Sequence, residues 1–293
     1  MPKSDNMRGA VLMMGSMAAF TLNDTLMKSL AGDMPLLQAL FLRGLPTSLF
    51  LGWLAWRAGA FRRLPGWSDA GLIALRSGAE VAAAWLFLTA LFNAPQANVT
   101  AILQALPLTV TLAAALFLGE PLGWRRLVAI AVGFAGVMLI VRPGLAGFTI
   151  WSLYALAAVV MVTLRDLAVR RMSDAVSSEA VAFAGAVGVA VAAGLGLWSG
   201  GAGSWVPVDG GAAALLAGAA LFVIGGYLFS VMVMRVGEIG FVAPFRYTSL
   251  LWAVVLGFLV FGELPDMLTL AGSAIVVATG IYSFRRERLR ARG

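Results

Sequence analysis

Four ionisable side chains lie inside long apolar stretches of this sequence: Arg43, Arg76, Glu80 and Arg246. A charge at membrane depth costs roughly 2.5–3.5 kcal/mol, so each needs a partner or a water-filled cavity. Arg76 and Glu80 are four residues apart, a spacing that allows an ion pair on one helix face. Two interpretations follow for Glu80: a structural pair with Arg76, or a carboxylate that meets a substrate ammonium group.

Arg246 follows Pro244 within the apolar stretch 239–261 and is flanked by Tyr247. Proline removes a helical hydrogen bond and frees backbone carbonyls, which is tolerated at membrane depth where they line a cavity. A guanidinium beside hydroxyl groups suits a carboxylate-bearing substrate. Arg246 is therefore predicted to bind substrate together with Tyr247, or else to bond structurally to loop carbonyls.

The stretch 96–118 resembles 239–261, because it also contains a proline, Pro107, among polar residues that include Thr100 and Gln104. Proline-interrupted spans in matching positions are a sequence indication of a central binding site. We expect Thr100 and Gln104 to contribute to that site.

Three further residues are candidates for the same site. Arg43 either pairs with Glu80 or Asp24, or projects into the cavity. Trp85 and Tyr227 are aromatic residues that either pack in the core or stack on apolar and cationic parts of a substrate.

The remaining charges near the ends of apolar stretches have plainer interpretations. Asp24 and Asp166 are predicted to pair with the basic residues four positions on, Lys28 and Arg170. The turn residues Glu120 and Glu263 are predicted to cap the helices that follow them.

The elements that must position these residues are membrane-spanning helices. The 293 residues are 61% hydrophobic and 12% charged, with a mean hydropathy of +0.92, a composition typical of polytopic membrane proteins. The expected spans each suffice to cross a hydrocarbon core of about 30 Å. They cover residues 8–27, 34–56, 70–92, 96–118, 124–141, 149–168, 177–198, 211–234, 239–261 and 267–284.

The pattern of the first half recurs in the second. Thr-Leu-Asn-Asp at 21–24 matches Thr-Leu-Arg-Asp at 163–166, Trp85 matches Tyr227, and Gly-Glu-Pro at 119–121 matches Gly-Glu-Leu-Pro at 262–265, at offsets of 142, 142 and 143 residues. Five spans per copy force the second copy upside down. The prediction is an all-α polytopic membrane protein of ten transmembrane helices, in two inverted five-helix repeats at 1–144 and 145–293.

The two copies differ where chemistry is expected. In the repeat register Arg43 corresponds to Gly185 and Glu80 to Phe222, while Arg246 corresponds to Gln104 or Leu103. The matched motifs therefore indicate the helical scaffold that the two copies share, and the unmatched charges indicate the expected binding site.

The distribution of positive charge predicts the orientation. With the N-terminus in the cytoplasm, sixteen of the 21 Lys and Arg residues, Arg165 and Arg170 among them, fall on the cytoplasmic side or close to it, and Lys28 and Arg142 fall outside. This bias predicts a multi-pass protein of the bacterial inner membrane with both termini cytoplasmic. The net charge of +7 is thus a topology signal rather than a nucleic-acid footprint. The sequence has no Cys and no His, so we expect no thiolate, imidazole or zinc chemistry, no metal and no cofactor.

Ten spans in two repeats, each with a Gly-Glu-Pro or Gly-Glu-Leu-Pro turn before its last helix, resemble the drug/metabolite transporter superfamily, and within it the EamA-type carriers. The Leu42-Arg43 pair is also similar to a pattern common in that family. The resemblance implies a secondary carrier working by alternating access, resembling bacterial exporters of neutral or aromatic amino acids. It also implies a cavity lined by spans one to four and six to nine, with the fifth and tenth spans peripheral or forming a homodimer.

The expected function is therefore transport of a small, carboxylate-bearing metabolite across a lipid bilayer. Arg246 is predicted to hold the carboxylate, Glu80 the ammonium group, and Trp85 and Tyr227 the side chain. S-adenosylmethionine or a nucleotide-like compound is the alternative cargo. A membrane-embedded enzyme is a remote alternative, because the acidic residues are scattered and there is no His.

Overall fold

The computed structural model describes residues 3–61, 65–144, 148–173, 175–200, 205–236 and 239–291. Within these ranges, ten helical segments are long and apolar enough to cross a membrane. The elements are α1 (Lys3–Lys28), α2 (Leu36–Arg57), α3 (Trp67–Asn93), α4 (Gln96–Leu103), α5 (Leu106–Leu118), α6 (Trp124–Val141), α7 (Ile150–Arg171), α8 (Ser178–Trp198), α9 (Gly210–Val236), α10 (Ile239–Val242), the 3-10 helix η1 (Ala243–Tyr247), α11 (Thr248–Phe261) and α12 (Met267–Ala291). The all-α architecture with ten spans is as expected.

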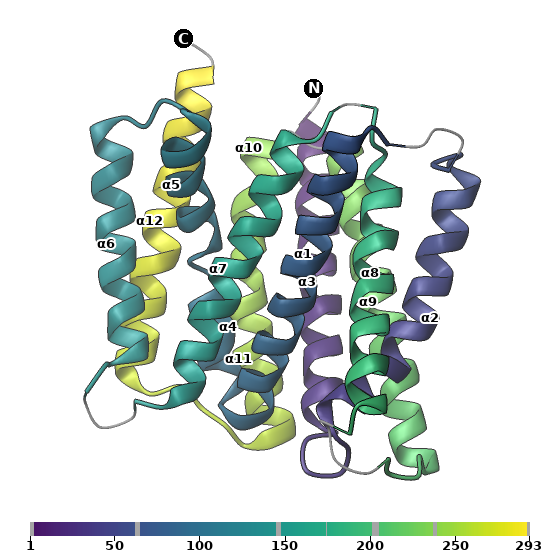
Figure 1. The fold of residues 1–293 in the computed structure, drawn as a ribbon. Helices are drawn as coiled ribbons and strands as arrows, with labels where there is room; N and C mark the ends of the chain where they lie inside the picture. The colour runs from purple at the N-terminus through teal and green to yellow at the C-terminus, as the bar shows by residue number, and fades with distance from the viewer. Residues whose placement is uncertain are drawn as a thin grey trace.

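The helices run up and down in one bundle, so α1 begins and α12 ends at the same end (Figure 1). We call this the proximal end, and the opposite end, where α1 finishes at Lys28, the distal end.

The fourth and ninth spans are broken, as their prolines predict. The fourth is divided into α4 and α5, with Pro107 in the first turn of α5, and the ninth into α10, η1 and α11, with Pro244 in the first turn of η1. Proline is tolerated in a first turn because its missing N–H has no helical acceptor there. The interruptions at 104–105 and 243–247 correspond in the repeat register although the two prolines do not, so both halves break at equivalent depth.

The two halves pack against each other reciprocally. Helix α1 packs on α9 and α7 packs on α3, which are the first and third spans of opposite halves. The second spans, α2 and α8, pack together, and so do the last spans, α6 and α12. Such an exchange is the arrangement that inverted repeats produce. The division at residues 144 and 145 stays a prediction.

Each half ends its broken span in the same way. Gly119 after α5 and Gly262 after α11 adopt left-handed φ values of 69° and 67°, which glycine accepts without strain.

The predicted capping by Glu120 and Glu263 is wrong. The N-cap residue of α6 is Gly123 and no side chain caps that helix, while before α12 the Oδ1 of Asp266 accepts the Thr269 N–H at 2.8 Å. Asp266 also accepts a hydrogen bond from Arg142, and these bonds lower the pKa of the carboxyl to about 2.

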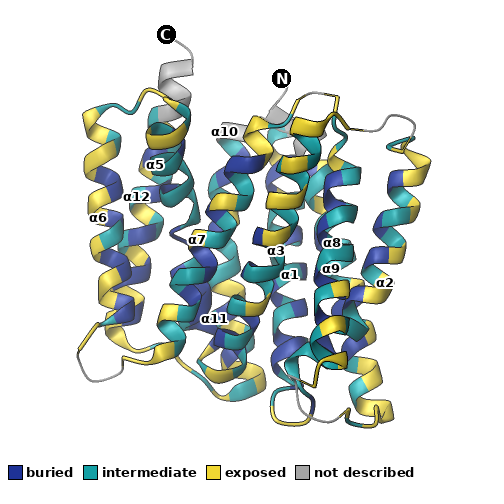
Figure 2. Ribbon diagram, in the orientation of Figure 1, coloured by how far each residue is buried: buried dark blue, intermediate teal, exposed yellow. Residues whose placement is uncertain are grey.

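Helices α6 and α12 lie side by side at the left edge of the bundle (Figure 1), which fits the peripheral position that the resemblance implies. Buried residues face the bundle interior, while α6 and α2, at opposite edges, carry many exposed residues (Figure 2). The close approach of α6 to α12 depends on Gly136 and Gly272, since a Cβ on Gly272 would lie 2.5 Å from the Gly136 carbonyl oxygen.

Candidate functional site

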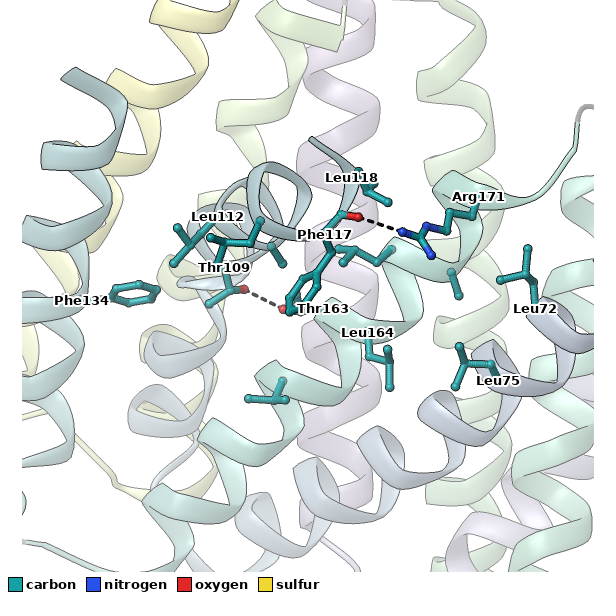
Figure 3. A pocket seen from close by; sticks show the side chains of 15 residues that line it. Leu72, Leu75, Thr109, Leu112, Phe117, Leu118, Phe134, Thr163, Leu164 and Arg171 are labelled. Carbon is teal, nitrogen blue, oxygen red and sulfur yellow. Dashed lines mark hydrogen bonds between the residues drawn. The ribbon is translucent and has the colours of Figure 1, made fainter. Parts of the chain in front are cut away.

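Two cavities are candidates for the site, and their linings differ in chemistry. The larger, of about 510 Å³, is walled mainly by apolar residues of α3, α5 and α7 such as Leu112 and Leu164 (Figure 3). Its polar groups already bond to the protein: the Thr109 and Thr163 hydroxyls bond to each other at 2.8 Å, and Arg171 Nη2 donates to the Phe117 carbonyl at 2.8 Å. Apart from these three side chains, its lining is entirely apolar.

The smaller cavity, of about 260 Å³, carries the charges, and we therefore take it as the candidate site. Helices α1, α2, α3, α7, α8 and α9 surround it, so both halves contribute. Its polar and aromatic lining consists of Phe20, Arg43, Thr47, Arg76, Glu80, Arg165 and Tyr227. We call it the central cavity.

Glu80 lies between two guanidinium groups. Its Oε2 is 3.3 Å from Arg76 Nη2 on the same helix and 3.2 Å from Arg165 Nη1 on α7. Arg165 Nε also contacts Asp166 Oδ1 at 2.8 Å, and Arg76 Nη1 donates to the Val181 carbonyl of α8 at 2.9 Å. The helical pair expected from the spacing therefore exists, but α7 extends it into a cluster that joins α3, α7 and α8.

Arg43 is held less completely. Its Nη1 donates to Asn23 Oδ1 of α1 at 3.1 Å, and Asn23 Nδ2 in turn donates to Asp24 Oδ1 at 2.9 Å. The remaining donors of Arg43 bond to no described residue. A guanidinium with free donors at a cavity wall can bind a carboxylate in bidentate fashion.

The structure thus brings together three of the residues expected in a site: Arg43, Glu80 and Tyr227 all line the central cavity. Trp85 does not line it. The Trp85 indole is 44% exposed and lies against Tyr154 of α7, with ring centroids 5.9 Å apart, because the helical register of α3 turns it away from Glu80.

Arg246 and Tyr247 also lie outside the lining. The Arg246 side chain is exposed and has no hydrogen bond or ion pair with a described residue, although Asp166 and Arg165 act on it electrostatically. Tyr247 is buried against Gly280 of α12, and its hydroxyl has no partner among the described residues. Substrate contact by either residue stays a prediction.

Gln104 and Thr100 are buried at the break in the fourth span. Gln104 Nε2 donates to Ser249 Oγ at 2.7 Å, so it links the break in one half to the break in the other. The Thr100 carbonyl accepts the Gln104 N–H at 3.2 Å. Both residues bond within the protein here, and their predicted role in substrate binding stays untested.

Sequence reasoning missed Arg165, which it assigned to the cytoplasmic charges, whereas the structure places Arg165 in the cavity wall. The repeat register contains a signal that would have found it, because Arg165 corresponds to Asn23 within the otherwise matched 21–24 and 163–166 motifs. An unmatched charge inside a matched motif is the same asymmetry that Arg43 and Glu80 show.

The predicted helical pairs of Asp24 with Lys28 and of Asp166 with Arg170 are wrong. Lys28 Nζ bonds to Glu263 at 2.6 Å, and Arg170 Nη1 bonds to Glu120 at 2.5 Å. The aspartates lie one helical turn deeper and bond to their own neighbours, Asn23 and Arg165. The basic residues at these two helix ends thus bond to the opposite half rather than to their own aspartates.

The fold and this cavity define a class, namely a polytopic α-helical membrane protein with a charged central site between two halves. Residues 7–142 match the EamA-like transporter family. This match covers just under half of the chain, and in that part the chain is similar to EamA-like transporters of the drug/metabolite transporter superfamily.

Several characterised proteins are similar in sequence. The chain is 25% identical over 200 residues to an S-adenosylmethionine uptake transporter of Rickettsia bellii (strain RML369-C), covering 67% of this chain and 66% of that protein. It is 27% identical over 199 residues to a riboflavin transporter of Rhizobium johnstonii (strain DSM 114642 / LMG 32736 / 3841), covering 66% and 63%. These two alignments each span just under two thirds of the relative's length.

A longer alignment connects the chain with the pseudopaline exporter CntI of Pseudomonas aeruginosa (strain UCBPP-PA14), 25% identical over 284 residues and covering 96% of this chain and 97% of that one. A protein of known crystal structure superposes with a TM-score of 0.66 at 18% identity, over 97% of this chain and 99% of the other. That likeness concerns the fold.

Proposed function

We propose that the protein is a secondary carrier that moves a small, carboxylate-bearing metabolite through the central cavity by alternating access. The observation that carries this proposal is the charge of the cavity wall, where three arginines face one glutamate among the described lining residues. This excess of positive charge favours a cargo with at least one anionic group.

The cargo that best fits both signs of charge is an α-amino acid. Arg43 has free donors and would bind the carboxylate, and Glu80 would receive the ammonium group in place of one of its guanidinium partners. Tyr227 and Phe20 would contact the side chain of a neutral or aromatic amino acid. This assignment moves the carboxylate partner from Arg246 to Arg43, because Arg43 lines the cavity.

The size of the cavity supports a small cargo. At about 260 Å³ the cavity is below the ~300–1,000 Å³ typical of pockets for larger ligands. S-adenosylmethionine is the second candidate, favoured by the alignment with the Rickettsia transporter. It carries an amino-acid end that Arg43 and Glu80 would bind, but its adenosine part requires a wider cavity.

We further propose export as the direction, from the full-length alignment with the pseudopaline exporter. The proximal end would face the cytoplasm of a bacterial cell, with the protein in the inner membrane. The outer faces of α6 and α12 would form the interface of a homodimer, since these two helices pack mainly on each other at one edge of the bundle.

The test is counterflow in proteoliposomes with labelled neutral and aromatic amino acids, S-adenosylmethionine and riboflavin. Arg43→Gln should lower counterflow at least about tenfold, because a hydrogen bond to a charged group contributes roughly 1.5–3 kcal/mol. Arg57→Gln is the matched control on the same helix, since Arg57 lies over the Trp53 ring at the end of α2 and does not line the cavity.

Wild-type counterflow by Arg43→Gln would overturn the role of Arg43. Transport of cations without a carboxylate, and of none of the carboxylate-bearing compounds, would overturn the cargo class.

A further inference from the structure

Among the described residues, one ion pair at each end of the bundle joins the end of a first span to the other half, and the distal end also holds the Arg142–Asp266 pair between the halves. At the distal end, Lys28 of α1 bonds to Glu263 in the turn between α11 and α12, with Nζ 2.6 Å from Oε1 and 2.7 Å from Oε2. At the proximal end, Arg170 of α7 bonds to Glu120 in the turn between α5 and α6, with Nη1 2.5 Å from Oε1. Each pair ties the end of a first span to the last turn of the other half.

The two pairs are counterparts in the repeat register. Arg170 follows Lys28 by 142 residues, and Glu263 follows Glu120 by 143. These are the offsets that relate the halves elsewhere in the chain. Exchange of the two halves therefore converts one pair into the other, and their positions follow from the repeat itself rather than from a local accident.

The pairs differ in how tightly they are enclosed. The Lys28 and Glu263 side chains are 8% and 27% exposed, against 42% and 50% for Arg170 and Glu120. Lys28 Nζ also donates to the Ala94 carbonyl at 2.8 Å, and Glu263 Oε2 accepts the Gln96 N–H at 3.1 Å. The distal pair is thus embedded in the loop that leads into the fourth span, whereas the proximal pair is open to its surroundings.

The central cavity lies nearer to the loosely held pair. On α7 its lining residue is Arg165, five residues or about 7.5 Å from Arg170 of that pair at the helical rise. On α1 its lining residue is Phe20, eight residues or about 12 Å from Lys28. The layer of protein between the cavity and the end of the bundle is therefore thicker at the distal end, where the enclosed pair lies.

We infer that Lys28–Glu263 and Arg170–Glu120 are two alternating latches, of which the enclosed one seals the cavity on its own side. This inference rests on the proposed carrier function. In the structure both pairs are bonded, but only the distal latch is enclosed. In the opposite state the proximal latch is enclosed in the same way and the distal latch opens, since each state of an inverted-repeat carrier is the exchanged form of the other.

The test uses the absence of cysteine from the sequence. A single cysteine at Ala186, which lines the cavity on α8, is labelled in oriented proteoliposomes by a membrane-impermeant maleimide added from one side or the other. Glu263→Gln should raise the labelling rate from the distal side several-fold and lower the rate from the proximal side. The matched Glu120→Gln should change the two rates in the opposite sense.

The charge exchange Lys28→Glu with Glu263→Lys should restore the wild-type labelling pattern, and thermal unfolding of each variant identifies any that fails to fold. If Glu263→Gln does not fold, the opposite shift in Glu120→Gln and the restored pattern in the exchange variant decide the question. Unchanged rates in folded Glu263→Gln or Glu120→Gln, or an exchange variant that folds but labels abnormally, would overturn the latches.

The labelling needs no cargo, so its outcome is separate from that of the proposed function. Shifted labelling with no counterflow of any tested compound leaves the latches standing and rejects the cargo. Normal counterflow with unshifted labelling rejects the latches alone.

Discussion

At the scale of single residues, the most consequential arrangement is the position of Glu80 between Arg76 and Arg165. It offsets part of the repulsion among the arginines of the cavity wall. Loss of one partner from a partly buried cluster leaves the remaining charges uncompensated, a cost that exceeds that of losing an exposed pair.

Glu80→Gln is therefore expected to destabilise the protein by about 2–4 kcal/mol, measured as an apparent melting temperature lower by roughly 4–12 °C in detergent. Glu120→Gln is the matched control, because its pair with Arg170 is half exposed and should contribute at most about 1 kcal/mol. Equal losses in the two variants would contradict the special position of Glu80.

Residue types and spacing predicted part of this site. Ionisable side chains in apolar stretches identified Arg43 and Glu80, because their burial needs compensation whatever the details of the fold. The sequence did not indicate that Trp85 and Tyr247 turn away from the cavity, since the direction of a side chain depends on which face of its helix meets a neighbour. Arg165 was missed because its position near the end of α7 resembles that of a charge at the membrane surface.

At the scale of elements, the main feature is that the two broken spans are joined to each other at their breaks. The Gln104–Ser249 bond joins the two breaks, and the backbone at the first break is satisfied by short-range bonds such as Ala105 N–H to the Ile102 carbonyl at 3.1 Å. Proline content predicted both interruptions, but only the helices themselves show that the breaks share one depth.

The contact between α6 and α12 provides a test at this scale. Gly272→Ala places a Cβ 2.5 Å from the Gly136 carbonyl oxygen and 2.7 Å from Ile140 Cγ1, so the helices must separate. We expect a loss of about 1–3 kcal/mol, observed as a lower apparent melting temperature.

Gly78→Ala on α3 is the matched control, because a Cβ there meets no atom within 4 Å. Alanine in an open helical position should stabilise by roughly 0.5–1 kcal/mol. A Gly272→Ala variant as stable as the wild type would show that α6 and α12 adjust without cost.

At the scale of the whole molecule, the orientation in the membrane is the prediction with the widest consequences, since it assigns the central cavity and both latches to a side. The charge bias predicts that the proximal end faces the cytoplasm. Ser68 at the start of α3 and Ser199 after α8 are exposed at the proximal and distal ends respectively.

Single cysteines at these two positions test the orientation in intact cells. An impermeant maleimide should label Ser199→Cys directly, and Ser68→Cys only after the membrane is permeabilised. The reverse pattern would place the termini outside and exchange the assigned roles of the two latches.

The sequence alone determined the class, the ten spans and the internal repeat of this protein, because span length, hydropathy and recurrent motifs are properties of the chain read in order. It also identified the charges whose burial must be compensated. The tertiary structure alone decided which charges meet. Lys28 bonds to Glu263, 235 residues away, rather than to an aspartate four residues away, and Arg165 bonds to Glu80 across the two halves. The physical reason is that an ion pair forms where helix packing brings two side chains within bonding distance, and that packing depends on contacts between halves that are distant in sequence.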